Sequence, residues 1–219
     1  MNDLLVICCT RGRPDKAKEM FNSLKETSSC DVVFCLDSDD PAISKYNEWM
    51  GENRIIGNGQ TTTQLINLAF RSNPEYEFYS VTNDDVVYET PGWDVALKNK
   101  GKISYGNDKC QGVNMPTISV IDGDICRAVG WLQMIKLTHL YGDCVWKAIG
   151  ERLKILYYDK NVIINHKHFI YNRRIEKDSI YSKTNSHDMY VTDGHAFEIW
   201  VRDEMINDCN KIKEILCHR

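Results

Sequence analysis

The sequence predicts a fold of the α/β class, in which helices flank a sheet that contains parallel strands. Two observations predict this class. Short apolar runs of strand length alternate with segments of helical periodicity through the first half of the chain. Polar loops follow three of the apolar runs, and ligands of such sheets bind beyond the carboxyl ends of the strands. We therefore expect these three loops to form one site.

The first half of the chain contains the clearest elements. Leu4–Cys9 is a continuous apolar run typical of a buried strand. Pro14 suits the first turn of a helix, and apolar residues recur on one helical face from Ala17 to Leu24. Further strands are predicted at residues 32–36, 54–56 and 78–81, and further helices at residues 44–50 and 62–71.

The second half is less regular. A helix is predicted over residues 143–153, because Val145, Trp146 and Ile149 fall on one face. Residues 170–194 are polar and poorly patterned, and residues 196–217 are predicted to form an amphipathic helix. Strands are predicted at residues 102–105, 117–121, 154–158 and 161–165, with a short helix or turn at residues 123–131.

The composition of the 219 residues sets limits on function. The hydrophobic fraction of 42% is ordinary for a globular protein, and the net charge of −4 gives no overall basic signature for nucleic acid. Local basic clusters at residues 98–102 and 173–177 leave a nucleic-acid contact open, although such clusters are usually solvated.

The cysteines and the N-terminal residues predict a cellular compartment. Nine cysteines are scattered without a C-x-x-C pair, which suits a reducing environment better than a disulfide framework. The N-terminal residues lack the features of a signal peptide, and no apolar run approaches membrane-spanning length. We therefore expect a cytoplasmic protein without membrane insertion.

An acidic pair, Asp84 and Asp85, follows the apolar run at residues 78–81. Adjacent carboxylates repel each other, and a divalent cation such as Mg²⁺ or Mn²⁺ is the usual compensation. Such cations are often held by one or two carboxylates together with substrate phosphates. A turn is the alternative, because Asn83 and the two aspartates are also good turn formers.

Two further loops carry candidate binding residues. Arg11 and Arg13 lie just before a helix N-terminus, an arrangement suited to a pyrophosphate, although a solvated basic turn would look the same. Asp37 ends the strand at residues 32–36 and can accept a hydrogen bond from a nucleobase or a ribose hydroxyl, or serve as a turn residue.

The second half adds candidates for catalysis and binding. His166 and His168 alternate at a strand end, so only one of them is expected to face a metal site. Asp143 is either a helix N-cap or a general base. Trp93 and Trp131 are either core residues or stacking platforms for a sugar or base.

The chain resembles nucleotide-sugar glycosyltransferases of the GT-A fold, family 2-like. The resemblance is carried by the loop at residues 10–14, Asp37, the acidic loop, Asp143 and His166. The resemblance runs from about residue 4 to residue 168. It implies a Rossmann-like mixed sheet flanked by helices, and the helix predicted at the end of the chain adds a C-terminal helical extension. The implied domains are a catalytic domain at residues 1–169, divided near residue 90 into nucleotide-binding and acceptor-binding halves, and a lid-like loop and helix at residues 170–219.

The resemblance also implies a role for each candidate residue. Asp85 and His166 would bind Mn²⁺ or Mg²⁺, and Asp143 would be the base of an inverting displacement, although the family's Glu-Asp pair is Gly142-Asp143 in this chain. Trp93 and Trp131 would contact the acceptor. The residues implied to bind the nucleotide sugar are Thr10, Arg11, Arg13, Asp37, Asn83 and Asp84.

The partners follow from the same resemblance. The donor would be a nucleotide-diphosphate sugar, and the acceptor a glycan, a protein, a small molecule or, as in some phages, DNA with hydroxymethylated bases. The setting would be a bacterium or a phage-infected cell. Outside the resemblance, the unpatterned residues 170–194 are either a lid over the donor, with Lys183 and His187 as candidate phosphate contacts, or disordered. The C-terminal helix is expected to pack on the core or form a homodimer.

Two other classes stay open. A nucleotidyltransferase has a similar frame and also needs a metal, but usually has a Gly-rich phosphate loop, whereas residues 10–13 contain one glycine. A non-catalytic module that binds a nucleotide sugar or glycan would keep the fold without using Asp143.

Overall fold

The computed structural model describes residues 3–168 and 179–217. The strands are β1 Leu4–Cys9, β2 Asp31–Asp37, β3 Arg54–Gly57, β4 Phe78–Thr82, β5 Val86–Tyr88, β6 Ile103–Asn107, β7 Ser119–Asp122 and β8 Leu156–His166. Within these described residues they form one sheet in the order β3-β2-β1-β4-β7-β6-β8-β5. The sheet is mixed, because β7 pairs antiparallel with β4 and β6, and β5 pairs antiparallel with β8.

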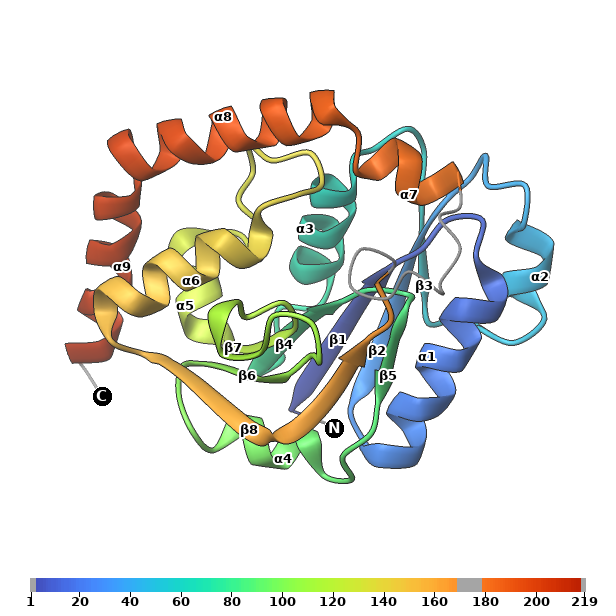
Figure 1. The fold of residues 1–219 in the computed structure, drawn as a ribbon, viewed down its shortest axis with the longest axis horizontal. Helices are drawn as coiled ribbons and strands as arrows, with labels where there is room; N and C mark the ends of the chain where they lie inside the picture. The colour runs from blue at the N-terminus through green and yellow to red at the C-terminus, as the bar shows by residue number, and fades with distance from the viewer. Residues whose placement is uncertain (1–2, 169–178, 218–219) are drawn as a thin grey trace.

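Helices cover both faces of the sheet (Figure 1). They are α1 Pro14–Thr27, α2 Ile43–Asn47, α3 Thr62–Ser72, α4 Trp93–Lys98, α5 Gly123–Val129, α6 Gly142–Leu153, α7 Ser179–Thr184, α8 His187–Asp203 and α9 Met205–Cys217. One buried cluster packs α3, α5, α6 and α9 against one face, and a second packs α1 and α4 against the other. The predicted α/β class is confirmed.

The register of the parallel strands places three loops at one edge. Strand β1 pairs in parallel with β2 on one side and with β4 on the other. Cys9 lies opposite Cys35, and Cys8 lies opposite Thr82. The loops that follow these strands therefore emerge side by side, as the sequence predicts.

The pairing of β8 with β5, at the side of the sheet, brings the end of β8 to the loop after β4. In the antiparallel pairing of β5 with β8, His166 lies directly opposite Val86. The backbone N–H of Lys167 also donates to the carbonyl of Asp85 at 2.8 Å. A residue late in the chain is thus placed beside the acidic loop by backbone pairing alone.

The observed elements differ from the predicted ones in the second half. The strands predicted at residues 154–158 and 161–165 are one irregular strand, β8, which begins only at Leu156 and whose pairing with β6 shifts register after Gly106. The helix predicted over residues 196–217 is two helices, α8 and α9, and α8 begins at His187, inside the segment described as poorly patterned. Its pattern is weak because Asp193 and Trp200 are its only buried residues in the described part of the chain.

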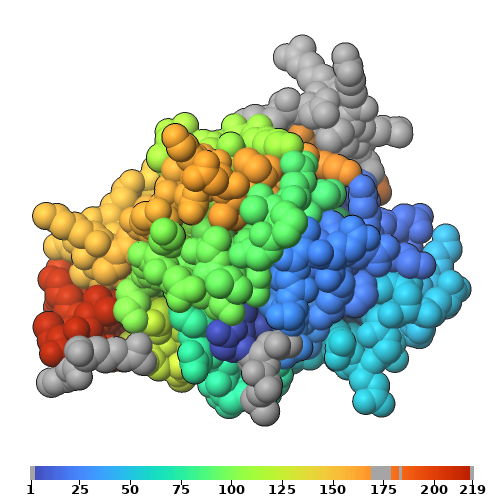
Figure 2. Space-filling view, turned by 90° about the horizontal axis from the view of Figure 1, so that it is seen from below, coloured from blue at the N-terminus to red at the C-terminus, as the bar shows by residue number. Residues whose placement is uncertain are grey.

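The C-terminal helices pack back on the domain. Trp200, Cys209 and Ile212 belong to the same buried cluster as Trp146 and the apolar side of α3. Figure 2 shows the molecule from below, where β8, the segment around β5 and α1 form a continuous surface. A homodimer through the C-terminal helix stays a prediction. No helix in the described part of the chain is long and apolar enough to cross a membrane.

Candidate active site

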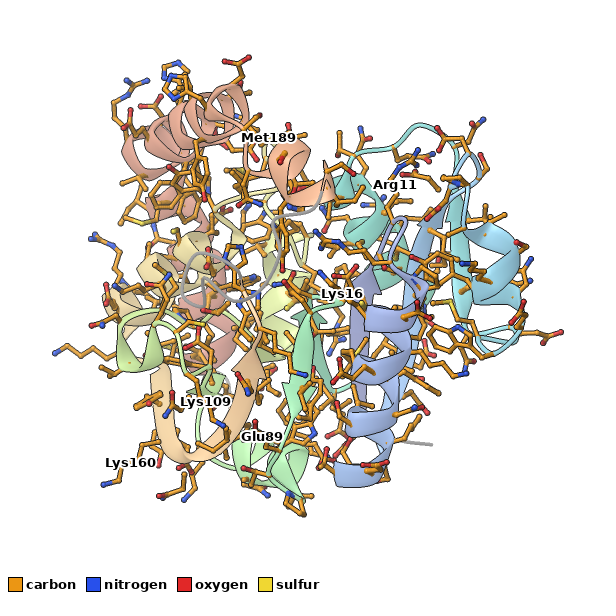
Figure 3. All side chains as sticks on the ribbon, turned by 45° about the vertical axis from the view of Figure 1, so that its right-hand side comes forward. Arg11, Lys16, Glu89, Lys109, Lys160 and Met189 are labelled. Carbon is orange, nitrogen blue, oxygen red and sulfur yellow. The ribbon has the colours of Figure 1, made fainter. Side chains whose placement is uncertain are left out.

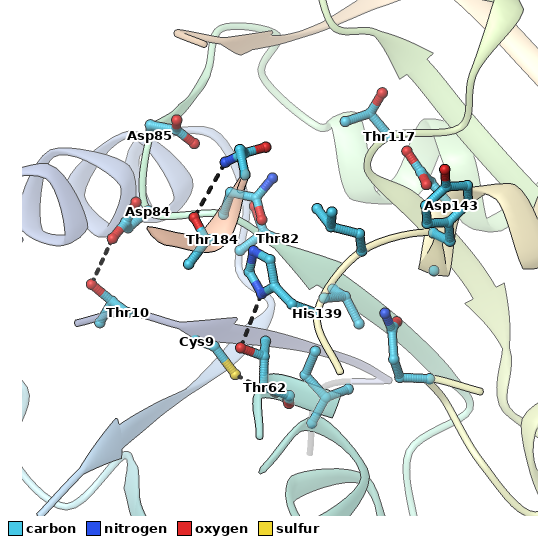
Figure 4. Close-up of a pocket in the computed structure, with 18 of the residues that line it drawn as sticks. Cys9, Thr10, Thr62, Thr82, Asp84, Asp85, Thr117, His139, Asp143 and Thr184 are labelled. Carbon is cyan, nitrogen blue, oxygen red and sulfur yellow. Dashed lines mark hydrogen bonds between the residues drawn. The ribbon is translucent and has the colours of Figure 1, made fainter. Parts of the chain in front are cut away.

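A cavity of about 490 Å³ lies at the edge where β1, β2 and β4 end. Its walls come from the loops after these strands, the N-terminal ends of α3 and α6, and the helices α7 and α8 (Figure 4). Thr10, Asp84 and Asp85 lie on one side of this view, and Thr117 and Asp143 on the other. The three predicted loops therefore do share one cavity.

Asp84 ties the loop after β4 to the loop after β1. Its Oδ2 accepts a hydrogen bond from Thr10 Oγ1 at 2.7 Å, and its Oδ1 lies 3.1 Å from an Nη atom of Arg13. Burial raises the pKa of Asp84 to about 6, because the Arg13 contact only partly offsets lost solvation and repulsion from Asp85.

Asp85 pairs with His166. Nε2 of His166 lies 3.2 Å from Oδ1 of Asp85, and Nδ2 of Asn83 lies 3.5 Å from the same nitrogen. The hydroxyl of Tyr181, on α7, donates to Oδ2 of Asp85. Burial raises the pKa of Asp85, but the hydrogen bonds from His166 and Tyr181 outweigh it, and the net pKa is lower than usual.

The donor set of this pair fits a divalent cation. A carboxylate oxygen and an imidazole nitrogen that face each other suit Mn²⁺, and a carboxylate with phosphates suits Mg²⁺. No group of three or more His, Cys, Asp or Glu side chains among residues 3–168 and 179–217 is arranged to hold a metal ion. An ion whose coordination is completed by substrate phosphates and water needs no third protein ligand.

The nucleotide side of the cavity contains Asp37 and Arg11. An Nη atom of Arg11 lies 3.0 Å from Oδ2 of Asp37 and 2.6 Å from Oδ1 of Asp39. Oδ1 of Asp37 is buried and has no hydrogen-bond partner among the described residues. Such an atom is costly unless a ligand satisfies it. Figure 3 shows Arg11 and Met189, which both line the cavity, at the end of the molecule away from the Glu89–Lys109 ion pair.

Asp143 lies at the start of α6, on the wall opposite the acidic loop (Figure 4). It does not cap the helix through its side chain, because the N-cap residue is Tyr141. One oxygen accepts from the backbone N–H of Cys144 at 2.8 Å. Burial raises the pKa of Asp143 above its ordinary value. A carboxyl group with a raised pKa on a cavity wall is suited to accept a proton.

The residue before Asp143 is a glycine for a packing reason. A Cβ atom at Gly142 would lie 2.2 Å from the side-chain nitrogen of Gln133, which is itself 7% exposed. A glutamate at this position, as in the family pair, would need the space that Gln133 fills. The glycine before Asp143 is thus explained by the side chain of Gln133, which fills the space beside it.

The predicted acceptor contacts at Trp93 and Trp131 do not agree with the structure. Trp93 is fully buried at the start of α4 and stacks on Tyr88, with ring centroids 4.6 Å apart. Trp131 is 5% exposed and packs on Trp146 in the core. Neither lines the cavity, whereas Trp146 does, with its indole N–H bonded to the carbonyl of Leu132. The sequence pattern had assigned Trp146 to a packed helical face.

Two residues of the cavity wall carry no signal in the sequence. His139 lines the wall, and its Nδ1 lies 3.0 Å from Oγ1 of Thr62 at the start of α3. Burial lowers the pKa of His139. The guanidinium carbon of Arg13 lies 4.1 Å from the centroid of the Tyr181 ring. Tyr181 also bonds to Asp85 and closes the cavity over it. Both depend on long-range packing, so only a fold can reveal them.

The remaining predicted contacts differ in whether they reach the cavity. His168 lines the cavity, with its ring 5.1 Å from that of Tyr181, but Nε2 of His166 is the nitrogen that faces Asp85. His187 is exposed and does not line the cavity. Arg173, Arg174, Lys177 and the side chain of Lys183 lie outside the described residues.

The arrangement of the sheet defines a class of fold. The chain has the GT-A type of Rossmann-like fold, in which a mixed sheet is flanked by helices. No protein-family model matches the chain, and no curated protein matches it in sequence.

Solved structures share this fold at low sequence identity. The mannosyltransferase PcManGT from Pyrobaculum calidifontis, in complex with GDP-Man and Mn²⁺, is 11% identical with a TM-score of 0.57, over 98% of this chain and 79% of that one. TarS from S. aureus is 12% identical with a TM-score of 0.55, over 74% of this chain. The match spans only 36% of the TarS chain. A putative glucose-1-phosphate thymidylyltransferase from Bacillus anthracis is 9% identical with a TM-score of 0.53, over 82% of this chain and 98% of that one.

Proposed function

We propose that the chain is a metal-dependent glycosyltransferase, which moves a sugar from a nucleotide-diphosphate sugar to an acceptor hydroxyl with inversion. The observation that carries the proposal is the pairing of Asp85 with His166, 3.2 Å apart, on a cavity that also contains Asp37 and Asp143. Similarity of fold to PcManGT, which was solved with GDP-Man and Mn²⁺, supports it.

The donor would lie along the edge of the sheet. The buried, unpartnered oxygen of Asp37 would accept a hydrogen bond from the base or the ribose. Arg11 and Arg13 would contact phosphate oxygens, and Asp85 and His166 would hold Mn²⁺ or Mg²⁺. Such an ion supplies positive charge that stabilises the departing diphosphate.

Transfer would be a single displacement. Asp143 would take the proton from the acceptor hydroxyl, whose oxygen attacks the anomeric carbon on the face opposite the diphosphate. The bond between that carbon and the phosphate oxygen breaks, and the nucleoside diphosphate leaves with the electron pair. The proton remains on Asp143, and the anomeric configuration is inverted.

Residues of the C-terminal extension would cover the donor. Tyr181 and Met189 line the cavity from α7 and α8, across from the strand ends. We propose that the lid-like segment and the catalytic domain act together, with residues 1 to about 90 binding the nucleotide and the following residues to about 169 binding the acceptor.

The proposal is tested by incubating the purified chain with MnCl₂ and a panel of UDP, GDP, dTDP and ADP sugars. We expect release of the free nucleotide from at least one donor, and loss of this activity on addition of EDTA. Failure of the chain to bind or hydrolyse any member of the panel would overturn the proposal. Donor binding without release of nucleotide, equal in the wild-type chain and in Asp143→Asn, would indicate a non-catalytic binding module.

The acceptor is proposed to be a glycan, a protein or a small molecule ahead of DNA with hydroxylated bases. The net charge of −4 argues against a large phosphate interface. Binding of DNA should weaken steeply between low and moderate salt, whereas binding of a neutral acceptor should change little. A steep salt dependence would therefore reverse this order.

A nucleotidyltransferase is the second candidate. The similarity to the thymidylyltransferase, and to a cytidylyltransferase from Leptospira borgpetersenii with a TM-score of 0.53, favours keeping it. Its reaction joins a nucleoside triphosphate to a sugar phosphate and releases pyrophosphate. Pyrophosphate formation from such a mixture, without turnover of any nucleotide sugar, would select it over the glycosyltransferase.

A further inference from the structure

The loop that leads into α6 is held by a carboxylate from the C-terminal extension. Asp193, on α8, is fully buried. Its Oδ1 accepts from the backbone N–H of Thr138 at 2.8 Å, and its Oδ2 accepts from those of His139 at 2.8 Å and Leu140 at 2.7 Å. Three successive N–H groups that converge on one point form an anion-binding nest, and here a side chain of the same chain fills it.

The same loop is fixed on its other side by α3. The backbone N–H of Thr63 donates to the carbonyl of Thr138 at 3.2 Å, and the His139 ring contacts the hydroxyl of Thr62. The loop therefore spans from the N-terminus of α3 to the middle of α8. Of these contacts, the charge-assisted bonds to Asp193 are the stronger ones.

The loop ends in a conformation that needs outside support. Tyr141, the residue before α6, has φ of +66°, which a non-glycine residue rarely adopts. Its ring stacks on Phe197 of α8, with centroids 5.6 Å apart. A Cβ atom at Gly194 would lie 3.1 Å from the Tyr141 hydroxyl, so α8 approaches the loop closely at the residue after Asp193.

This geometry bears directly on the proposed base. Asp143 follows Tyr141 by two residues, and its place on the cavity wall depends on where α6 starts. We propose that Asp193 is a positioning residue for Asp143, acting through the loop at residues 138–141 without touching substrate. The inference rests on the proposed function and makes the C-terminal extension part of the catalytic apparatus.

The test compares Asp193→Asn with Asp208→Asn. Asp208 is a matched control, because it is a buried aspartate of the same extension that accepts from the Trp200 indole, 2.9 Å away, and does not contact the loop. The probes are MnCl₂ with UDP-glucose, UDP-GlcNAc and GDP-mannose in turn. Release of nucleotide is measured at a temperature well below the unfolding midpoint of each variant.

For Asp193→Asn we expect kcat to fall between about 10-fold and 100-fold, with KM for the donor and binding of the free nucleotide within about 3-fold of wild type. Hydrogen exchange of the amides of residues 138–140 should accelerate in this variant alone. Asp208→Asn should leave kcat within about 3-fold. If Asp193→Asn does not fold, Gly194→Ala, which favours the helix and presses on Tyr141, should lower kcat in the same direction.

The outcomes separate the two proposals. Faster exchange at residues 138–140 with unchanged kcat, or equal loss of kcat in both variants, would overturn the positioning role while leaving the transferase intact. Absence of nucleotide release by the wild-type chain with every donor would overturn the proposed function and, with it, the role of Asp193.

Discussion

Nε2 of His166 lies 3.2 Å from Oδ1 of Asp85, although the two residues come from distant parts of the chain. The antiparallel pairing of β5 with β8 brings them together, since it sets His166 opposite the residue that follows Asp85. The site therefore depends on the backbone register at the end of the sheet as much as on the two side chains.

The first prediction concerns metal binding by this pair. Asp85→Ala should weaken Mn²⁺ binding at least about 10-fold and remove metal-dependent release of nucleotide, because one of two protein ligands is lost. Mn²⁺ binding is measured by electron paramagnetic resonance. Asp39→Ala is the control, since Asp39 is an exposed carboxylate at the same sheet edge that does not line the cavity. Equal binding by both variants would exclude Asp85 as a ligand.

The second prediction concerns the base. The pKa of Asp143 is raised by burial, and the carboxylate is the form that accepts a proton. Activity should therefore rise with pH through the pKa of Asp143 and reach a plateau above it. Asp143→Asn should lower kcat at least about 100-fold while donor binding, followed by calorimetry, is retained. Normal turnover by this variant would assign the proton transfer to another group.

The fold of the first half was predictable because local pattern and tertiary role agree there. The apolar runs of β1 and β2 are largely buried, so their sequences are almost continuously apolar. The strand β5 and the helix α4 escaped prediction because they are short, and the first half of α8 because only Asp193 and Trp200 of its described residues are buried.

The site was predictable where residues follow strand ends. Asp37 and the acidic loop lie at the cavity because parallel strands place their carboxyl ends together. His139 and Tyr181 reach it through long-range packing, which leaves no local pattern. The sequence left Trp93 and Trp131 open between core and acceptor contact because an indole ring suits a core and a sugar equally well, and only burial separates the two.

The third prediction concerns stability. The pKa of Asp84 is raised to about 6, above its value in the unfolded chain, so proton binding favours the folded state. This stabilisation is present at low pH and is lost as the pH rises through about 6. Between about pH 4.5 and 7.5, Asp84→Asn should become more stable relative to wild type by on the order of 2 kcal/mol.

The measurement is urea unfolding of the metal-free proteins at both pH values. The difference between variant and wild type removes the contribution of other titrating groups. A pH-independent difference for Asp84→Asn would mean that the contacts with Arg13 and Thr10 fully offset the cost of burial.

The last prediction separates core tryptophans from the cavity wall. Trp93→Phe should lower the free energy of unfolding by about 1–2 kcal/mol, a modest cost because the indole nitrogen of Trp93 is buried without a partner among the described residues. It should leave the rate of nucleotide release within about 2-fold of wild type, because Trp93 lies on α4, away from the cavity. Trp146→Phe removes the hydrogen bond to Leu132 and part of the wall beside Asp143, so it should lower both stability and rate. Unfolding by urea and nucleotide release are measured on the same samples. A loss of rate in Trp93→Phe as large as that in Trp146→Phe would show that Trp93 reaches the substrate after all, in a state of the protein that differs from this one.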